Sequence, residues 1–172
     1  IRGEGHISNP YRQLLIYEAL GFDPPQFAHL STILGDDGTK LSKRHGATSM
    51  DEFRGQGYLP EALVNYLALL GWAPTQEGKE LLTPEQLTSQ FDLSRVNRSP
   101  AAFDWEKLNW VNRSHLKELD CSRLAELALP YFIEHGWIFP ENPKPVQAWL
   151  EEVIEALLKY VNKLEDLVKE AD

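Results

Sequence analysis

The first regular pattern of hydrophobic and polar residues predicts a helix over residues 9–20. Asn9 suits the capping position, Pro10 fits the first turn, and Gly21 is the residue type that follows a helix end. Four apolar residues recur at the spacing of one helix face and predict a stripe that packs against a core: Tyr11, Leu14, Leu15 and Ala19.

The middle of the chain is predicted to contain a strand followed by capped helices. After the break at Pro24-Pro25, residues 26–34 are expected to form a buried strand. Ser49 and Glu52 have the spacing of a capping box, which predicts a helix start. The clearest helix is expected over residues 60–70, where four apolar residues share one face: Leu63, Tyr66, Leu67 and Leu70.

The remaining pattern is helical. Thr83 and Gln86 form a second capping box, for a helix that reaches about Phe91, and Asp120 suits the cap of a helix that continues through Pro130. A linker is indicated by three prolines: Pro140, Pro143 and Pro145. One long amphipathic helix is then predicted from seven apolar residues: Val146, Trp149, Val153, Leu157, Val161, Leu164 and Val168. Such a stripe needs a partner helix, which we expect to lie outside this chain.

The elements predicted above make the chain mainly α-helical with a small α/β part, and the composition is that of a globular protein of one to two domains. The 172 residues are 42% hydrophobic and 25% charged, and no apolar run is long enough to span a bilayer. No signal-peptide pattern opens the chain. The single cysteine, Cys121, excludes an internal disulfide and favours a reducing, cytoplasmic location; we interpret it as a small residue at a helix start. The five histidines are scattered, so we expect no metal site.

The net charge of −9 argues against indiscriminate binding of nucleic acid. The charge is distributed unevenly, being 0 over residues 1–48, −3 over residues 49–115 and −6 over residues 116–172. Any contact with RNA therefore requires local basic patches, and the neutral first segment suits one best.

The stretch from residue 35 to residue 46, which we call the basic loop, has the composition of a phosphate-binding loop. Asp36-Asp37-Gly38 predicts a turn, and Lys40, Lys43 and Arg44 follow within five residues. Ammonium groups and backbone amides on such a loop can bind the oxygens of a polyphosphate. The spacing excludes a Walker-type P-loop. The competing interpretation is a solvated surface loop.

Residues 40–44, Lys-Leu-Ser-Lys-Arg, resemble the KMSKS element of class I aminoacyl-tRNA synthetases, in the variant typical of bacterial glutamyl-tRNA synthetases. The similarity extends to both flanks and to later stretches, and it is collinear over at least residues 1–117. The matching stretches are Phe27 to Leu30, Arg44 to Ser49, Gly57 to Leu67, and Leu70-Gly71-Trp72.

The resemblance implies a site for ATP and glutamate. Lys40 and Lys43 would be the catalytic cations, with Leu41, Ser42 and Arg44 completing the motif. Residues 2–6 resemble the strand end at which the family's arginine binds the carboxylate of glutamate, so Arg2 takes that role. Further ATP contacts are implied at three residues: Gly5, Ile33 and Leu34. Gly5 departs from the acidic residue that most members carry, which leaves Glu4 as the nearby acid.

The resemblance also implies a division of the chain. Residues 1–48 would end a Rossmann-like class I catalytic domain, residues 49–115 would contact the tRNA stem, and residues 116–172 would begin a helical anticodon-binding domain. Candidate phosphate contacts are three arginines: Arg95, Arg98 and Arg113. The neighbouring rings of Phe103, Trp105 and Trp110 could also stack on RNA, although core packing is the simpler interpretation.

The implied function is part of a glutamate–tRNA ligase, acting on tRNA(Glu), L-glutamate and ATP with Mg as substrate. The full-length protein is expected to be a cytoplasmic monomer. Because Ile1 is no initiator and the family's HIGH motif is not in these residues, we expect a fragment without activity of its own. Two alternatives are a tRNA-modifying paralogue that makes glutamyl-queuosine, which the residues after Ser114 disfavour, and a non-catalytic helical interaction module.

Overall fold

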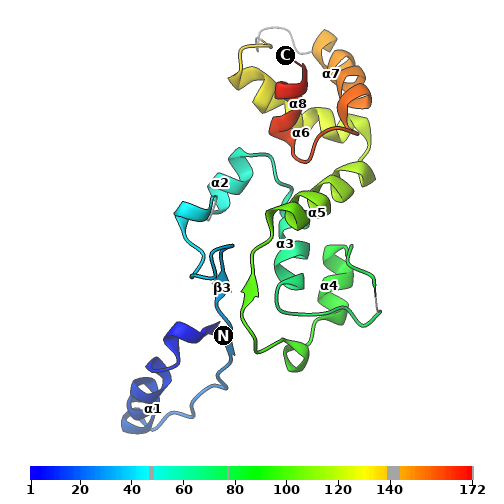
Figure 1. Cartoon of the computed structure of the whole chain (residues 1–172). Helices are drawn as coiled ribbons and strands as arrows, with labels where there is room; N and C mark the ends of the chain where they lie inside the picture. Colours follow the sequence, from blue (N-terminus) through cyan, green and yellow to red (C-terminus); the bar gives the residue numbers. More distant parts are fainter. Residues whose placement is uncertain (47–48, 77, 139–143, 172) are drawn as a thin grey trace.

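The computed structural model describes residues 1–46, 49–76, 78–138 and 144–171. It is an elongated, mainly helical structure in which α1 projects from one end and α6, α7 and α8 form the other (Figure 1). The predicted fold class, helices with a small α/β part, is therefore confirmed. Within the described ranges, every helix is too short or too polar to cross a bilayer. Of the predicted proline linker, Pro140 and Pro143 lie outside the described residues, whereas Pro145 belongs to α7.

Short parallel strands hold the N-terminal part together. The elements are β1 (Arg2–Gly3), a 3-10 helix (Glu4–His6), α1 (Asn9–Leu20), β2 (His29–Leu30) and β3 (Ile33–Leu34). β1 pairs with β2, so that Arg2 lies opposite His29, and β3 pairs with β4 (Ala101–Ala102). Parallel pairing between strands that are distant in sequence is typical of α/β folds.

The predicted core-facing stripe of α1 is wrong for this structure. The helix ends at Gly21 as expected, with Gly21 in the left-handed conformation at φ 68°, but none of its residues is buried. Tyr11 remains 70% exposed and Leu15 66% exposed. The apolar spacing identifies which face of the helix can pack against another element. Among the described residues, no element packs against that face.

The single buried strand predicted over residues 26–34 is also wrong. β2 and β3 are separated by Ser31 and Thr32, and neither strand is fully buried. Ser31 Oγ donates to the carbonyl of Arg98 at 2.7 Å, and the amide of Thr32 donates to Glu4 Oε1 at 2.9 Å. These bonds lie where the chain changes strand partner, from β1 to β4.

Both predicted capping boxes are confirmed. The amide of Ser49 donates to Glu52 Oε2 at 2.9 Å, and the reverse bond, from the Glu52 amide to Ser49 Oγ, measures 3.2 Å. Thr83 and Gln86 make the equivalent pair of bonds. The helices that follow are α2 (Met50–Gly55) and α4 (Pro84–Gln90), with α3 (Pro60–Leu69) between them as predicted.

The described residues of the C-terminal half form four helices: α5 (Trp105–Glu118), α6 (Cys121–Glu134), α7 (Lys144–Leu157) and α8 (Leu164–Ala171). Asp120 caps α6, so Cys121 begins it as predicted. The predicted continuous helix over residues 146–168 is wrong, because it divides into α7 and α8. The amides of Asn162 and Lys163 donate to Asp166 Oδ2 at 3.1 and 3.2 Å, which starts a new helix there.

The apolar stripe predicted over residues 146–168 is covered within the chain only in part: Val161, Leu164 and Val168 are buried, whereas Trp149 is 37% exposed. The fully buried residues of α7 are Leu150 and Ile154, which the predicted stripe did not include. α6, α7 and α8 pack together, and Leu150, Ile154, Val161 and Leu167 are at most 1% exposed. One hydrophobic core continues from Phe53 in α2 to Val168 in α8, while a smaller cluster forms around Trp72. Trp105 packs on the rings of Phe53 and Phe103, which supports its interpretation as a core residue.

Candidate functional site

The basic loop is a tight hairpin that extends from β3. The amide of Gly35 donates to the carbonyl of Thr39 at 2.8 Å, and the amide of Leu41 donates to that of Ile33 at 2.9 Å. Lys40 pairs with Leu34 in an antiparallel bridge, so the chain returns directly along the strand. The turn that Asp36-Asp37-Gly38 predicts is present, since the amide of Gly38 donates to the carbonyl of Gly35 at 3.0 Å.

The second half of the loop is a 3-10 helix (Lys43–His45) that begins with a capping box. The amide of Ser42 donates to His45 Nδ1 at 3.0 Å, and Ser42 Oγ lies 3.2 Å from the same nitrogen. His45 Nε2 lies 3.1 Å from Asp37 Oδ1, on the opposite arm of the hairpin. The His45 side chain is only 6% exposed and therefore fills the interior of the loop.

Sequence reasoning missed this role of His45, although a signal was present. Ser42 and His45 are three residues apart, which is the spacing of a capping box, but histidine is not the usual residue at its second position. At the far end of the loop, a Cβ on Gly46 would lie 2.7 Å from the ring of Trp105. The loop therefore ends in close contact with the first residue of α5.

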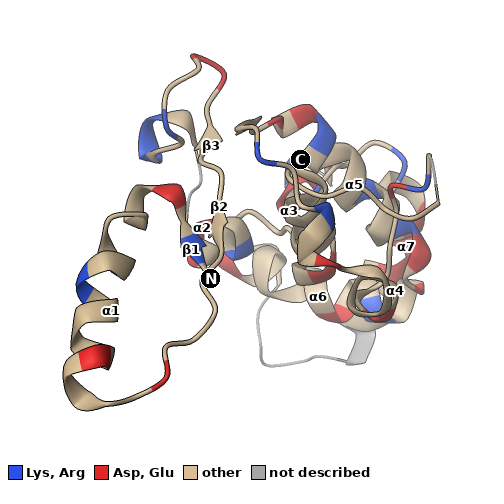
Figure 2. Cartoon of the chain, turned by 90° about the horizontal axis from the view of Figure 1, so that it is seen from below, with Lys and Arg blue, Asp and Glu red and all other residues tan. Residues whose placement is uncertain are grey.

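The three cations of the basic loop differ in their surroundings. Arg44 Nη2 donates to Asp37 Oδ2 at 3.0 Å and to Thr39 Oγ1, so its guanidinium braces the hairpin. Lys40 and Lys43 are exposed. Neither ammonium group forms a hydrogen bond or an ion pair with any residue in the described part of the chain. Two of the three cations are thus available to an external anion, and Figure 2 shows a basic segment beside β3.

Asp37 is the acceptor around which the hairpin closes. Hydrogen bonds from the side chain and the amide of Thr39 lower the pKa of the Asp37 carboxyl, and bonding to His45 and the charge of Arg44 lower it further. Asp36, Asp37 and His45 also place possible ligand atoms within 4.8 Å of one another. Donors from the loop already engage both oxygens of Asp37, so the internal bracing of the loop accounts for this grouping.

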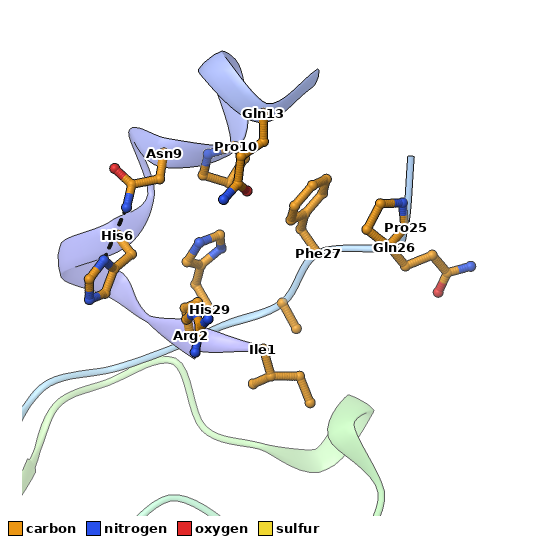
Figure 3. A pocket seen from close by; sticks show the side chains of 11 residues that line it. Ile1, Arg2, His6, Asn9, Pro10, Gln13, Pro25, Gln26, Phe27 and His29 are labelled. Carbon is orange, nitrogen blue, oxygen red and sulfur yellow. Dashed lines mark hydrogen bonds between the residues drawn. The ribbon is translucent and has the colours of Figure 1, made fainter. Parts of the chain in front are cut away.

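Arg2 lies on β1 beside a cavity of 370 Å³ (Figure 3). Besides Arg2, the polar side chains that line it are His6, Asn9, Gln13, Gln26 and His29. Asn9 Nδ2 lies 3.1 Å from His6 Nδ1 across one side. No residue of the basic loop lines this cavity, so the structure does not bring Arg2 together with Lys40 and Lys43 in one pocket.

The other predicted nucleotide contacts are distributed along the short strands. Gly5 is exposed in the 3-10 helix after β1, with no described atom within 4 Å of the position of a Cβ. The carbonyls of Ile33 and Leu34 accept from the amides of Leu41 and Phe103, so both already take part in hydrogen bonds. Glu4 is likewise engaged: bonding to Thr32 lowers the pKa of its carboxyl.

The three arginines predicted to contact tRNA occupy different surroundings. Arg95 donates to the carbonyl of Pro74 at 2.9 Å, and its guanidinium lies 5.6 Å from the ring centre of Trp72. Arg98 lies in the segment before β4, and Arg113 is half-buried on α5. Among the residues that the structure describes, no contact joins the three.

Comparison with known proteins identifies the family. Residues 1–110 match the family model described as tRNA synthetases class I (E and Q), catalytic domain. The chain belongs to this family. It is 52% identical over 171 residues to the glutamate–tRNA ligase of Carboxydothermus hydrogenoformans, and the match covers 99% of this synthetase chain and 35% of that ligase. It is 46% identical over 172 residues to the ligase of Desulforamulus reducens, covering 100% and 36%.

Solved structures agree with this assignment. A glutamate tRNA ligase from Elizabethkingia meningosepticum, crystallised in complex with its amino acid, superimposes with a TM-score of 0.78 at 29% identity. A second structure, the glutamate–tRNA synthetase of Elizabethkingia anophelis, gives a TM-score of 0.79 at 29% identity. The two superpositions cover 99% and 98% of this chain, respectively, and 36% of each solved chain. The chain thus spans about a third of the length of the relatives it matches.

Proposed function

We propose that this class I synthetase chain forms part of a glutamate–tRNA ligase, in which the basic loop binds the phosphates of ATP while glutamate is activated. The observation that carries the proposal is the contrast within the loop. Arg44 braces the hairpin internally, whereas the ammonium groups of Lys40 and Lys43 have no partner among the described residues. Cations held on a fixed frame stabilise developing negative charge without reorganising.

The reaction proposed for the complete enzyme has two steps. The carboxylate of glutamate attacks the α-phosphorus of ATP, which forms glutamyl-adenylate and releases pyrophosphate. A hydroxyl of the terminal ribose of tRNA(Glu) then attacks the acyl carbon, and AMP leaves. Lys43 neutralises charge on the phosphates and Lys40 assists. ATP enters as its magnesium complex, so the metal is part of the substrate.

Arg2 is proposed to bind the carboxylate of glutamate. A guanidinium can donate two parallel hydrogen bonds to a carboxylate, and the cavity beside Arg2 provides space and further polar groups. Gly5, Ile33 and Leu34 are proposed to border the nucleotide, chiefly through their backbones.

Contacts with tRNA and the division of the chain are also proposed. Residues 1–48 would complete the catalytic domain, residues 49–115 would support the acceptor stem, and residues 116–172 would begin the anticodon-binding part. Arg98 and Arg113 are better placed than Arg95 for phosphate contact, because Arg95 is bonded internally. We further propose a monomeric, cytoplasmic enzyme. The match of the ligases to 99% or more of this chain favours the ligase over the tRNA-modifying paralogue.

The test is the exchange of pyrophosphate into ATP by the complete ligase that contains this chain, with glutamate and tRNA(Glu) present. Lys43→Ala should lower the rate by about 100-fold, the range found when one charge-stabilising group is removed from an active site. Lys117→Ala, which removes an exposed lysine in the last turn of α5, is the matched control and should have no effect. A Lys43→Ala enzyme with nearly normal exchange would refute the proposed role of the loop.

A further inference from the structure

We propose that His45 is the positioning residue that fixes Lys40 and Lys43 relative to each other, through its hydrogen bond with the backbone of Ser42. The inference rests on the proposed function of the basic loop. Ser42 lies between the two lysines in the chain, and its amide donates to His45 Nδ1 at 3.0 Å. The position of this amide decides how the chain turns from the hairpin arm that carries Lys40 into the helical turn that carries Lys43.

The hydrogen bonds define which nitrogen of His45 carries the proton. A backbone amide can only donate, so Nδ1 must accept and its lone pair must face Ser42. The proton is then on Nε2, which donates to Asp37 Oδ1 at 3.1 Å. In this tautomer Nε2 has no free lone pair, so the approach of Arg44 Nε to 3.3 Å is a contact and not a hydrogen bond. The ring therefore links the two arms of the hairpin, with one bond to each.

Gly35 provides the space that this ring occupies. A Cβ on Gly35 would lie 2.6 Å from His45 Cδ2 and 2.7 Å from Nε2, which is closer than real contacts allow. Gly35 is buried, and its backbone has no conformation that requires glycine, since it is not among the glycines with positive φ. The demand for glycine at this position thus comes from the imidazole ring.

The first experiment separates the two bonds of His45 in the complete ligase. His45→Asn keeps an acceptor oxygen where Nδ1 lies, His45→Gln keeps a donor where Nε2 lies, and His45→Ala keeps neither. Because a displacement of about 1 Å can cost about 100-fold in rate, His45→Ala and His45→Gln should lower kcat for pyrophosphate exchange by about 30- to 100-fold. His45→Asn should stay within about threefold of the wild type. The KM for glutamate should not change, because no loop residue lines the cavity at Arg2.

The second experiment tests whether His45 acts through the lysines. Where two residues work through one arrangement, their effects are not additive. His45→Ala should therefore add less than about threefold to the loss already caused by Lys43→Ala. Gly35→Ala should reproduce the loss of His45→Ala, yet cost nothing more in the Gly35→Ala/His45→Ala enzyme, where the ring is gone. His135→Ala, at an exposed histidine after α6, is the control and should be neutral.

Each result decides between the two proposals. If Lys43→Ala is inactive while His45→Ala exchanges normally, the inference about His45 is wrong and the function of the loop stands. The same holds if His45→Asn is as slow as His45→Ala, or if the losses multiply in the double variants. If Lys43→Ala itself is normal, the proposed function fails and His45 loses its role with it. Nitrogen NMR of the histidine ring gives an independent readout: a proton on Nδ1 instead of Nε2 would overturn the inference.

Discussion

Asn112 joins three segments of the core. Its replacement is expected to destabilise the protein more than the replacement of an exposed polar residue. The residue is completely buried on α5. Its Oδ1 accepts from the amide of Leu59, at the start of α3, at 2.8 Å, and its Nδ2 donates to the carbonyl of Asn162, before α8, at 2.6 Å. One side chain thus holds together parts of the chain that are 50 residues or more apart in sequence.

The expected magnitude follows from the two backbone groups that lose their partner. Each buried group left without a hydrogen bond costs about 1–3 kcal/mol, so Asn112→Leu, which keeps most of the volume and leaves two such groups, should lower the free energy of unfolding by about 2–6 kcal/mol. That is a large part of the roughly 5–15 kcal/mol typical of a domain. Asn109→Ala is the matched control on the same helix. It removes one partly buried bond, from the hydroxyl of Tyr58, and should cost about 1 kcal/mol.

Equilibrium unfolding in urea, followed by tryptophan fluorescence and circular dichroism, measures both variants. The m-value should stay constant if only stability changes. The reasoning is refuted if Asn112→Leu unfolds at the same urea concentration as Asn109→Ala, or above the wild type. That outcome would mean that the amide of Leu59 and the carbonyl of Asn162 find other partners, and that packing rather than hydrogen bonding joins α8 to α3 and α5.

Three further predictions concern single groups. Gly57→Ala should lower the free energy of unfolding in urea by about 1–3 kcal/mol, because Gly57 has φ 84° and a Cβ there would lie 2.7 Å from the amide nitrogen of Leu164. The control is Gly136→Ala, at φ 76° but with no described atom within 4 Å of the Cβ, and it should cost less. Equal costs for the two variants would contradict the steric argument. Burial raises the pKa of Tyr58 and of Tyr66 to about 12, so stability should fall as the pH rises above about 10, where the unfolded tyrosines ionise, and alkaline absorbance titration should show at least two late tyrosines. The pKa of Asp37 is lower in the folded protein than in the unfolded chain, so this carboxylate stabilises the fold at pH values above about 4, and the stabilisation is lost as the pH falls below about 4. Thr39→Val should raise the pKa of Asp37, which carbon NMR of the carboxyl can measure. An unchanged pKa would contradict the assignment of the shift to Thr39.

The sequence predicted those features whose partners lie within a few residues. Both capping boxes, the turn at Asp36-Asp37-Gly38 and the cap at Asp120 depend on bonds between residues at most three apart. The break between α7 and α8 had a comparable local signal, because the carboxylate of Asp166 accepts from the amide of Lys163, three residues earlier. The regular apolar spacing over residues 146–168 concealed it, since two helices in succession can keep the spacing of one.

Features that depend on distant partners were predicted less well. Burial of residues 26–34 required knowledge of β1 and β4, and the exposure of α1 depends on what the rest of the molecule places against it. The candidate site shows the same division. The cations of the basic loop could be found from composition and resemblance, whereas the difference between Arg44 and the two lysines depends on Asp37, on the opposite arm of the hairpin. Residue type alone does not show which cation is already paired.

The bonding of the basic loop explains how a charged surface segment can hold a defined shape. Exposed ion pairs such as Arg44 with Asp37 contribute little by themselves, because solvent screens them. The imidazole of His45 is almost completely buried; it accepts from the amide of Ser42 on its own arm of the loop and bonds to Asp37 on the opposite arm. A loop braced in this way leaves Lys40 and Lys43 free to move at their ends while their backbone positions stay fixed. The backbone of a braced loop is already ordered when the protein folds, so its conformational entropy is not lost again on binding. An anion that binds these two lysines would therefore bind more tightly than it would to a loop that must become ordered in the complex.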